Sequence, residues 1–292
     1  MVAAIARWLI ERGERPAILS RGYGRRNRRD GVVVVSDGNL VLAGLDEAGD
    51  EPLMLAAELP GAIVAVAEDR FLAGVVAERR LDATVHILDD GFQHVQLARD
   101  FDVLMTSAGE VSRARVLPFG RLRESIDAAA RADIVVVLDA DFATARAEAW
   151  TLGISQAVAA RRRLDFAGAV GVSGVSGGWD AAAGAAVVAV AGIAHPDRFF
   201  QMLRDAGCNV AATLSFPDHH RYSPRDVVRV GGRARWAGTD TVVTTRKDLV
   251  RWQALGPLPF ECIAIPLRLE LEGWDTLTAS LDQAIARARE AA

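Results

Sequence analysis

The chain has 292 residues and a formal net charge of −4, and 51% of its residues are hydrophobic and 25% charged. This composition is that of a globular protein with a real core, and it excludes a disordered or fibrous chain. The net charge gives no reason to expect nucleic acid as a partner, and no apolar run approaches the ~20 residues that cross a bilayer. Cys208 and Cys262 lack metal-ligand spacing and are expected to be buried thiols in a reducing compartment.

The first half of the chain alternates helical and strand patterns. It opens with a helix that ends near Gly13, and a hairpin is expected around Asp37 and Gly38. Short buried runs predict strands at 16–20, 62–67, 85–88, 102–105 and 134–138. Further helices are expected at 50–59 and 70–80.

The segment 151–180 is rich in Gly, Ser and Arg, and we expect it to be a passage between two lobes. The alternation then resumes, with strands predicted at 187–191, 210–214, 241–245 and 262–265 and helices at 196–206, 224–236 and 274–289. Such alternation implies βαβ units and largely parallel sheets. We therefore predict an α/β protein with a core lobe at 1–160 and a smaller α/β lobe at 161–292, whose closing helix can pack back on the core.

Arginine is concentrated in two short runs. Each can be solvated surface, or a patch that meets phosphate groups or an anionic membrane. The two runs are Arg21, Arg25, Arg26, Arg28 and Arg29, and Arg161, Arg162 and Arg163.

Acidic residues stand where functional groups gather in α/β proteins, beyond the carboxyl ends of strands. Asp89 and Asp90 follow the strand at 85–88 and either hold Mg²⁺ or cap a turn. Asp50 precedes Glu51 and Pro52 at a helix start, where it is either an N-cap or a general base.

Three further clusters carry candidate chemistry. His219 and His220 follow Asp218 after a strand, and site and surface interpretations are equally weighted for them. The run Thr244 to Asp248 contains Lys247, the only lysine in the chain, but its spacing does not match the base-reading loop of GTPases. The arginines of the segment 117–124 suit phosphate or carboxylate recognition, or a solvated helix start.

In this order, these segments resemble the tetraacyldisaccharide 4'-kinases of lipid A synthesis. The resemblance runs from the first helix to Asp248, and eight motifs in register make it specific. They are Leu19-Ser20-Arg21-Gly22-Tyr23-Gly24, Gly49-Asp50-Glu51-Pro52, Glu68-Asp69-Arg70, Leu88-Asp89-Asp90-Gly91-Phe92-Gln93-His94, Leu117-Pro118-Phe119-Gly120-Arg121-Leu122-Arg123-Glu124, Ala191-Gly192-Ile193-Ala194-His195-Pro196, Phe216-Pro217-Asp218-His219-His220 and Thr244-Thr245-Arg246-Lys247-Asp248.

The resemblance implies transfer of the γ-phosphate of ATP, with Mg²⁺, to the 4'-hydroxyl of an acylated glucosamine disaccharide 1-phosphate. It implies a P-loop-NTPase-like core lobe, a smaller α/β lobe and a hinge. It also implies a peripheral enzyme on the cytoplasmic face of the inner membrane, with an anionic membrane surface as partner and no nucleic acid.

The resemblance also implies roles for particular residues. Asp50 is expected to activate the sugar hydroxyl, with a histidine partner for which His219 is favoured over His220. Metal binding is expected at Asp89, with Glu51 nearby, and a hinge pair at Asp90 and His94. The substrate-side groups are expected to be Arg70, Arg121, Arg123 and Glu124.

The family's Gly-x-x-x-x-Gly-Lys-Thr loop precedes the position at which this sequence begins, and no internal segment replaces it. Its backbone N–H groups and lysine hold the β- and γ-phosphates, so this polypeptide alone is expected to bind ATP poorly and turn over slowly. The alternative to a kinase is a catalytically inactive relative that binds the lipid A precursor.

Overall fold

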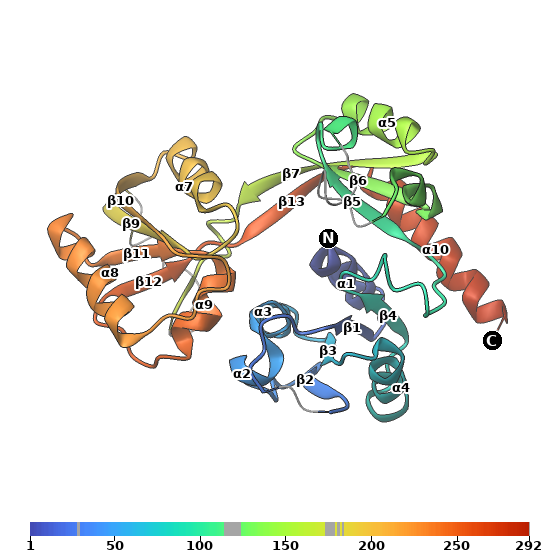
Figure 1. Cartoon of the computed structure of the whole chain (residues 1–292), viewed down its shortest axis with the longest axis horizontal. Coiled ribbons are helices and arrows are strands. Elements are labelled where there is room, and N and C mark those ends of the chain that lie inside the picture. The colour runs from blue at the N-terminus through green and yellow to red at the C-terminus, as the bar shows by residue number, and fades with distance from the viewer. Residues whose placement is uncertain (28–29, 114–123, 173–178, 180–181, 183, 292) are drawn as a thin grey trace. The chain divides into compact units, whose positions relative to one another are not determined.

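The computed structural model describes residues 1–27, 30–113, 124–172, 179, 182 and 184–291 (Figure 1). These residues form two compact units. Unit 1 holds Met1–Asp89 and Leu164–Arg268, and unit 2 holds Asp90–Arg163 and Leu269–Ala292. Both units are therefore discontinuous in sequence, and they differ from the continuous lobes expected at 1–160 and 161–292. The closing helix belongs to unit 2, together with the second part of the expected core lobe.

The first sheet of unit 1 is built from the N-terminal segment. Its strands are β1 (Pro16–Ser20), β2 (Val33–Asp37), β3 (Ile63–Val66) and β4 (Val85–Leu88), in the order β2-β3-β1-β4. β1 runs parallel to both β3 and β4, and β2 is antiparallel to β3. The second strand of the expected hairpin does not form. After β2, Val41 pairs with Ser36 in a single isolated antiparallel bridge.

Alternating strand residues divide the core of this sheet into two layers. Ile18 and Val64 face α1 (Val2–Glu11) and α3 (Asp50–Glu58), which cover one side of the sheet. Leu19 and Ala65 face α4 (Arg70–Leu81) on the other side. A short helix, α2 (Leu45–Ala48), leads directly into α3.

The second sheet of unit 1 comes from the later segment. Its order is β10-β9-β11-β12-β8, with β8 antiparallel at one edge and the other strands parallel. Helix α7 (Pro196–Asp205) packs on one face through Phe199 and Leu203. Helices α8 (Pro224–Trp236) and α9 (Arg246–Gln253) contribute Val230 and Trp252 to the other face. The strands are β8 (Val170–Gly171), β9 (Ala186–Ala191), β10 (Asn209–Ser215), β11 (Thr241–Thr244) and β12 (Glu261–Ala264).

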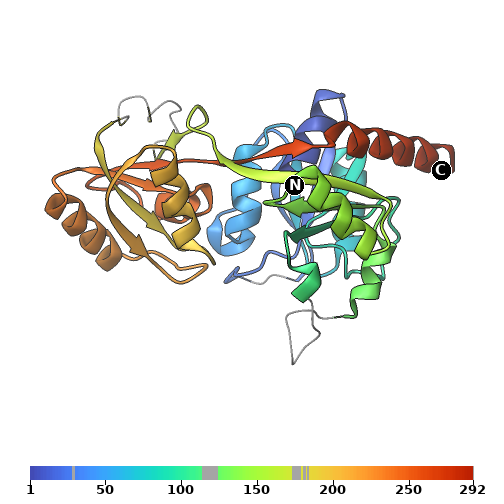
Figure 2. The ribbon, with the colours of Figure 1, turned by 90° about the horizontal axis from the view of Figure 1, so that it is seen from above.

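Unit 2 has its own sheet, in the order β13-β7-β6-β5. Its parallel strands are β5 (Val103–Ser107), β6 (Ile134–Leu138) and β7 (Gln156–Leu164), and β13 (Leu267–Glu272) lies beside β7 (Figures 1 and 2). Helix α5 (Phe142–Thr151) packs on β6 and β7 through Ala145 and Ala149. Helix α10 (Trp274–Ala291) is tied to β7 by a 2.8 Å hydrogen bond from Ser280 Oγ to Gln156 Oε1.

The prediction of a passage at 151–180 was wrong in its first part, because residues 156–164 form the strand β7. Its first half is buried, and its second half alternates between exposed and half-buried arginines. Because of these arginines, the composition of the segment resembles that of a linker, and the strand was not predicted. The strands of residues 1–160 belong to two sheets, β2-β3-β1-β4 in unit 1 and β13-β7-β6-β5 in unit 2.

Two chain-wide expectations can be compared with the structure. No helix within the described residues is both long and apolar enough to cross a membrane. Cys262 is buried, as predicted, and Cys208 is half-buried; both are free thiols. Burial raises the pKa of both thiols, so neither is an activated nucleophile.

Candidate active site

The candidate site begins at the start of α3, where Asp50 is the first helical residue. Gly49 precedes it with φ +85°, and a Cβ at Gly49 would lie 2.7 Å from the backbone oxygen of Tyr23. Only glycine therefore lets the start of α3 sit so close to the loop after β1. Asp50 is 5% exposed, so its carboxylate depends on protein partners.

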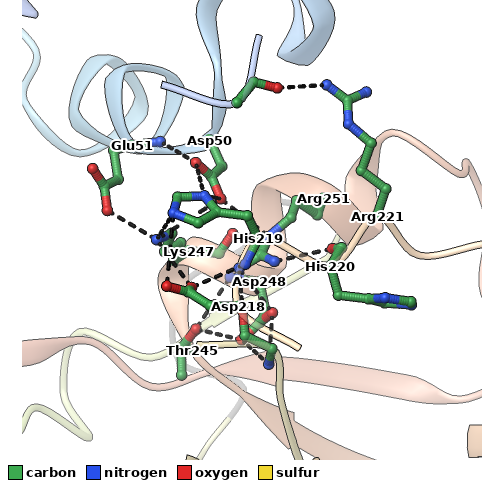
Figure 3. Close-up of polar contacts among 12 residues, drawn as sticks. Asp50, Glu51, Asp218, His219, His220, Arg221, Thr245, Lys247, Asp248 and Arg251 are labelled. Carbon is green, nitrogen blue, oxygen red and sulfur yellow. Dashed lines mark hydrogen bonds and ion pairs between the residues drawn. The ribbon is translucent and has the colours of Figure 1, made fainter. Parts of the chain in front are cut away.

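The principal partner of Asp50 is His219, from the loop between β10 and α8 (Figure 3). Nδ1 of His219 lies 3.1 and 3.0 Å from the two carboxylate oxygens of Asp50, although the residues are 169 positions apart. The backbone of His219 has φ +55°, and its N–H donates to Asp218 Oδ1 at 2.9 Å. The ring meets Tyr23 edge-on at 5.2 Å. An acid–imidazole pair is thus fixed by two separate loops.

His220 makes a different set of contacts, and Figure 3 shows its ring pointing away from Asp50. Its Nε2 lies 3.1 Å from Asp226 Oδ2, and its ring stacks on Phe216 at 4.7 Å. Asp226 also forms a capping box with Ser223 at the start of α8. Burial raises the pKa of Asp226, but the hydrogen bonds from Ser223 and His220 outweigh it and leave that pKa below its ordinary value. His220 therefore belongs to the cap of α8.

Lys247 joins the acid–imidazole pair from the first turn of α9. Its Nζ lies 2.9 Å from Glu51 Oε1, 3.5 Å from Asp218 Oδ1 and 3.3 Å from His219 Nε2. Asp50 Oδ2 is 4.0 Å away. The Lys247 side chain is 15% exposed. Its ammonium therefore offsets the negative charge of these carboxylates where solvent screening is reduced.

Arg251, one turn further along α9, contacts the same acid from the buried side. Its Nε lies 3.5 Å from Asp50 Oδ2, and the side chain is 2% exposed. The guanidinium also donates to the carbonyls of His220 and Gly192, each at 3.0 Å. It pairs with Asp248 at 3.1 Å. Arg251 therefore holds both Asp50 and the backbone next to His219.

Asp248 is fully buried and accepts hydrogen bonds from three loops. The donors are Gly192 N–H at 3.1 Å, Tyr222 O–H at 2.8 Å and Thr245 Oγ1 at 2.7 Å. Burial, followed by the charge of Asp248, raises the pKa of Tyr222, so the phenol stays a neutral donor. Asp248 thus fixes the loops that carry His219 and Lys247.

The sequence analysis gave no role to Lys247, Asp248 or Arg251, and it predicted no helix at 246–253. One signal was available. Thr245 is the N-cap of α9 and its side chain accepts from the N–H of Asp248. A Thr followed three residues later by an acid marks a helix start.

The second acidic cluster lies at the end of β4. The N–H of Asp89 donates to Leu19 O at 3.0 Å, and Ser20 Oγ lies 3.3 Å from Asp89 Oδ2. Asp89 is the last residue of this part of unit 1, and Asp90, with φ +53°, is the first of unit 2. Within the described part of the chain no hydrogen bond or ion pair joins Asp90 to His94, whose N–H donates to Gly91 O.

The predicted substrate-side residues lie in several places. Arg70 is the first residue of α4, 2% exposed, and its Nη1 donates to Glu68 O at 3.3 Å. Glu124 accepts from Arg131 Nη2 at 3.1 Å. Arg121 and Arg123 lie outside the described residues.

The two arginine runs are less open than their composition indicates. Arg25 is 6% exposed, and two arginines of the second run pair with carboxylates. Arg28 and Arg29 lie outside the described residues. The ion pairs are Arg25–Glu68 at 4.0 Å, Arg162–Asp139, and Arg163–Glu270 at 2.9 Å.

Fold and site together define a class of protein. The α/β sheets bring a buried acid, an imidazole and two cations to one place, and phosphoryl-transfer enzymes need such groups for alignment and charge neutralisation. The model of the family described as tetraacyldisaccharide-1-P 4'-kinase matches residues 1–286. The chain belongs to this kinase family.

Individual relatives agree with the family match. The chain is 43% identical to a tetraacyldisaccharide 4'-kinase of Geobacter metallireducens over 88% of this chain and 74% of that protein. It is 38% identical to one of Anaeromyxobacter over 97% of this chain and 78% of that protein. The crystal structure of LpxK from Aquifex aeolicus in complex with ATP covers 97% of this chain with a TM-score of 0.75 and 26% identity, and the match spans 83% of that chain. The predicted family and α/β fold are confirmed.

Proposed function

We propose that this protein transfers the γ-phosphate of ATP to the 4'-hydroxyl of the tetraacylated glucosamine disaccharide 1-phosphate in lipid A biosynthesis. The observation that carries the proposal is the buried Asp50–His219 pair, flanked by Lys247 and Arg251, in a chain of this kinase family. The ATP complex of the LpxK relative supports ATP as the donor.

In this reaction Asp50 accepts the proton of the attacking hydroxyl while His219 holds the carboxylate in place. A positioned general base contributes roughly 10²–10⁴-fold to the rate. Lys247 and Arg251 offset the negative charge of the buried Asp50, and Lys247 also pairs with the more exposed Glu51.

Mg²⁺ would supply charge neutralisation on the phosphates. It prefers one or two carboxylates and keeps waters and phosphate oxygens as its other ligands. Asp89 fits this need, since it stands at the end of β4 beside the hydroxyl of Ser20. Glu51, paired with Lys247, is the weaker candidate. Among the described residues, no group of three or more His, Cys, Asp or Glu side chains is placed to hold a metal ion.

The remaining predicted residues keep the roles that the family resemblance implies. Asp90 and His94 would act as the hinge pair, because the chain passes from unit 1 to unit 2 at Asp90. We propose from the family resemblance that Arg70, Arg121, Arg123 and Glu124 are substrate-side groups, with the arginines meeting the anionic head of the acceptor.

The lipid acceptor implies work at a membrane surface. We propose peripheral attachment at the cytoplasmic face of the inner membrane. The exposed Arg21 and Arg26 are candidates for contact with anionic headgroups.

The inactive lipid-binding alternative is not favoured. A protein that only binds lipid has no need of a buried carboxylate held against an imidazole by two cations, an arrangement that is costly unless its geometry is maintained. Asp50 and its three partners are all present.

The test is phosphate transfer from radiolabelled ATP to tetraacyldisaccharide 1-phosphate by the protein purified from its native cell. We expect product phosphorylated at the 4'-hydroxyl, and Asp50→Asn should lower kcat by roughly 10²–10⁴-fold. Transfer to another position, or turnover that Asp50→Asn leaves intact, would refute the proposal.

The paired histidines provide a matched comparison. His219→Asn should lower kcat strongly, because it removes the group that orients Asp50. His220→Asn should act mainly on the stability of the α8 cap, because His220 contacts Asp226 instead. Equal loss of kcat in both variants would contradict the assignment of His219.

A further inference from the structure

One side of helix α8 carries a basic surface that the candidate active site does not use. Arg225, Arg229 and Arg233 recur every four residues, so they lie along one side of the helix, and all three are exposed. Val228 and Trp236 are exposed on the same side. These five residues, which we call the α8 face, combine three cations with two apolar side chains.

The positive charge of the α8 face is not neutralised within the helix. Asp226 is the only acid of α8, and it is half-buried in the N-terminal cap, where Ser223 and His220 bind its carboxylate. Among the described residues, no carboxylate forms an ion pair with an arginine of the α8 face. The face is therefore complementary to a surface that supplies negative charge.

A groove of about 440 Å³ lies between α8 and the edge strand β10. Arg229 and Arg233 line it from the helix, and Thr213 and Leu214 line it from the strand. Trp236 also lines the groove. An anion bound there would meet two guanidinium groups and no carboxylate, and paired N–H donors of arginine match the oxygens of a phosphate.

Aromatic rings hold both guanidinium groups at the groove. The guanidinium of Arg229 lies over the ring of Phe216 at 5.4 Å, and that of Arg233 lies over Trp236 at 4.5 Å. Such stacking uses the flat face of the guanidinium and leaves its in-plane N–H donors available to an anion. The two side chains are thus ordered before a ligand arrives, which lowers the entropy cost of binding.

Gly232 keeps the groove open. A Cβ at this position would meet no atom within 4 Å, so the packing of α8 does not require glycine there. At the neighbouring Gly231, by contrast, a Cβ would contact Phe260 at 3.6 Å. Glycine is unfavourable inside a helix. Its presence at 232 is explained if a ligand occupies the space that a side chain would fill.

The apolar residues of the α8 face favour a lipid membrane as the source of the anion. Val228 is 70% exposed and Trp236 is 73% exposed, and water is a poor environment for both side chains. Arginines beside an exposed tryptophan suit the headgroup region of an anionic bilayer, where the ring meets apolar and polar groups together. The net charge of −4 disfavours nucleic acid as the partner.

We propose that the α8 face binds the anionic surface of a lipid membrane, with the groove as a site for one lipid phosphate. Arg229 and Arg233 bind the phosphate, and Trp236 and Val228 lie in the headgroup layer. This inference rests on the proposed function, which requires work at a membrane, and it adds a second contact to the arginine-rich loop after β1.

The test is binding of the purified protein to vesicles of phosphatidylglycerol and phosphatidylethanolamine, measured by flotation. Gly232→Glu places a carboxylate in the groove and should weaken binding by about fivefold, the contribution of one charge near an anionic surface. Gly232→Gln adds a side chain of the same size without charge and should weaken binding less. Both changes replace a helical glycine that faces open space, so both variants should fold. Unchanged binding by Gly232→Glu, or equal weakening in the two variants, overturns the proposal.

Removal of a cation provides an independent measurement. Arg233→Gln should weaken vesicle binding by about fivefold. Arg204→Gln removes the same charge from α7, which packs on the other face of the same sheet, and should leave the affinity unchanged. Equal loss in both variants would show that net charge alone matters and would overturn the proposal.

A local signal reports whether Trp236 meets the lipid. Vesicles that contain brominated lipids quench the fluorescence of tryptophans that enter the headgroup layer. The chain has six tryptophans, and Trp236→Phe should remove most of the quenching. Quenching that persists in full in this variant would place the membrane contact elsewhere and contradict the proposal.

Two other occupants of the groove give different results. If Gly232→Glu binds vesicles normally but loses binding to a single-stranded oligonucleotide, the partner is nucleic acid. If it binds vesicles normally but loses self-association, the partner is a second copy of the chain. Either result overturns the proposal.

Activity separates this inference from the kinase function. Gly232→Glu should keep the transfer rate on disaccharide dispersed in detergent and lower it on disaccharide held in anionic vesicles. An active kinase in which Gly232→Glu binds vesicles normally refutes the membrane inference alone. A protein that binds vesicles through the groove but does not phosphorylate the disaccharide refutes the kinase function alone.

Discussion

At the scale of single residues, the guanidinium of Arg251 connects groups from two helices and a loop. It reaches Asp50 on α3, the carbonyl of His220 and the buried Asp248. The Arg251 side chain is 2% exposed, so water cannot replace a partner that is lost. Arg251 therefore stabilises the fold by pairing with several buried polar groups at once.

Arg251→Met should therefore destabilise the protein by about 3–5 kcal/mol, because Asp248 and Asp50 would stay buried without the cation that pairs with them. Arg251→Lys keeps a charge but not the planar fork, and it should recover part of the loss. Urea unfolding of the two variants measures the difference. A loss below about 1 kcal/mol in Arg251→Met would show that Asp248 is satisfied by its other donors.

The residue scale also shows what the sequence could reveal. Asp50 and a histidine partner could be predicted because acids and histidines beyond strand ends are recognisable, and their motifs fall in the family's order. Arg251 could not. Its role depends on a fold that brings α9 against α3, and a single arginine within a helix has no distinguishing pattern.

At the scale of elements, two glycines illustrate how packing decides the effect of one methyl group. Gly74 lies inside α4, and a Cβ there would meet Leu19 and His86 at 3.6 and 3.8 Å, ordinary contact distances. Gly192 lies beyond β9, where a Cβ would be 3.1 Å from Asp248 Oδ1 and 3.2 Å from Tyr222 O–H.

The same substitution should have opposite effects at these sites. Gly74→Ala should stabilise α4 by about 0.5–1 kcal/mol, because it removes the helix cost of glycine without a clash. Gly192→Ala should destabilise by about 1–3 kcal/mol through overpacking against Asp248. Thermal unfolding of both variants provides the comparison, and a destabilised Gly74→Ala would mean that α4 cannot accommodate the methyl group.

Elements were predictable where their periodicity was strong, as for α4, α7, α8 and the buried strands. β7 was missed because arginines occupy its outer half, and β13 because its Leu and Glu residues are mostly exposed. α9 was missed because the sequence around Lys247 was interpreted as a motif and not as a capped helix.

At the scale of the whole molecule, each unit depends on chain segments far apart in sequence. Unit 2 takes β13 and α10 from the last segment, with Leu277 fully buried and Ser280 bonded to Gln156. The sequence could not predict this arrangement, because strand partners from distant segments leave no local pattern.

A chain that ends after Arg268 should therefore lose the order of unit 2 and keep that of unit 1. Hydrogen exchange should show loss of protection in β6 and β7 and near-native protection in β1, β3 and β9. Full protection of β6 in the shortened chain would show that α10 and β13 are dispensable.

The distance along the chain between Asp50 and His219 has a consequence for synthesis. A ribosome produces Asp50 early, and the N-terminal sheet can form while the imidazole, the lysine and the arginine are still untranslated. Chains released before Arg251 would contain the N-terminal sheet and Asp50, but they would lack the buried arginine that pairs with Asp50. The complete group of side chains therefore exists only in nearly finished chains, and we expect prematurely terminated products to lack kinase activity.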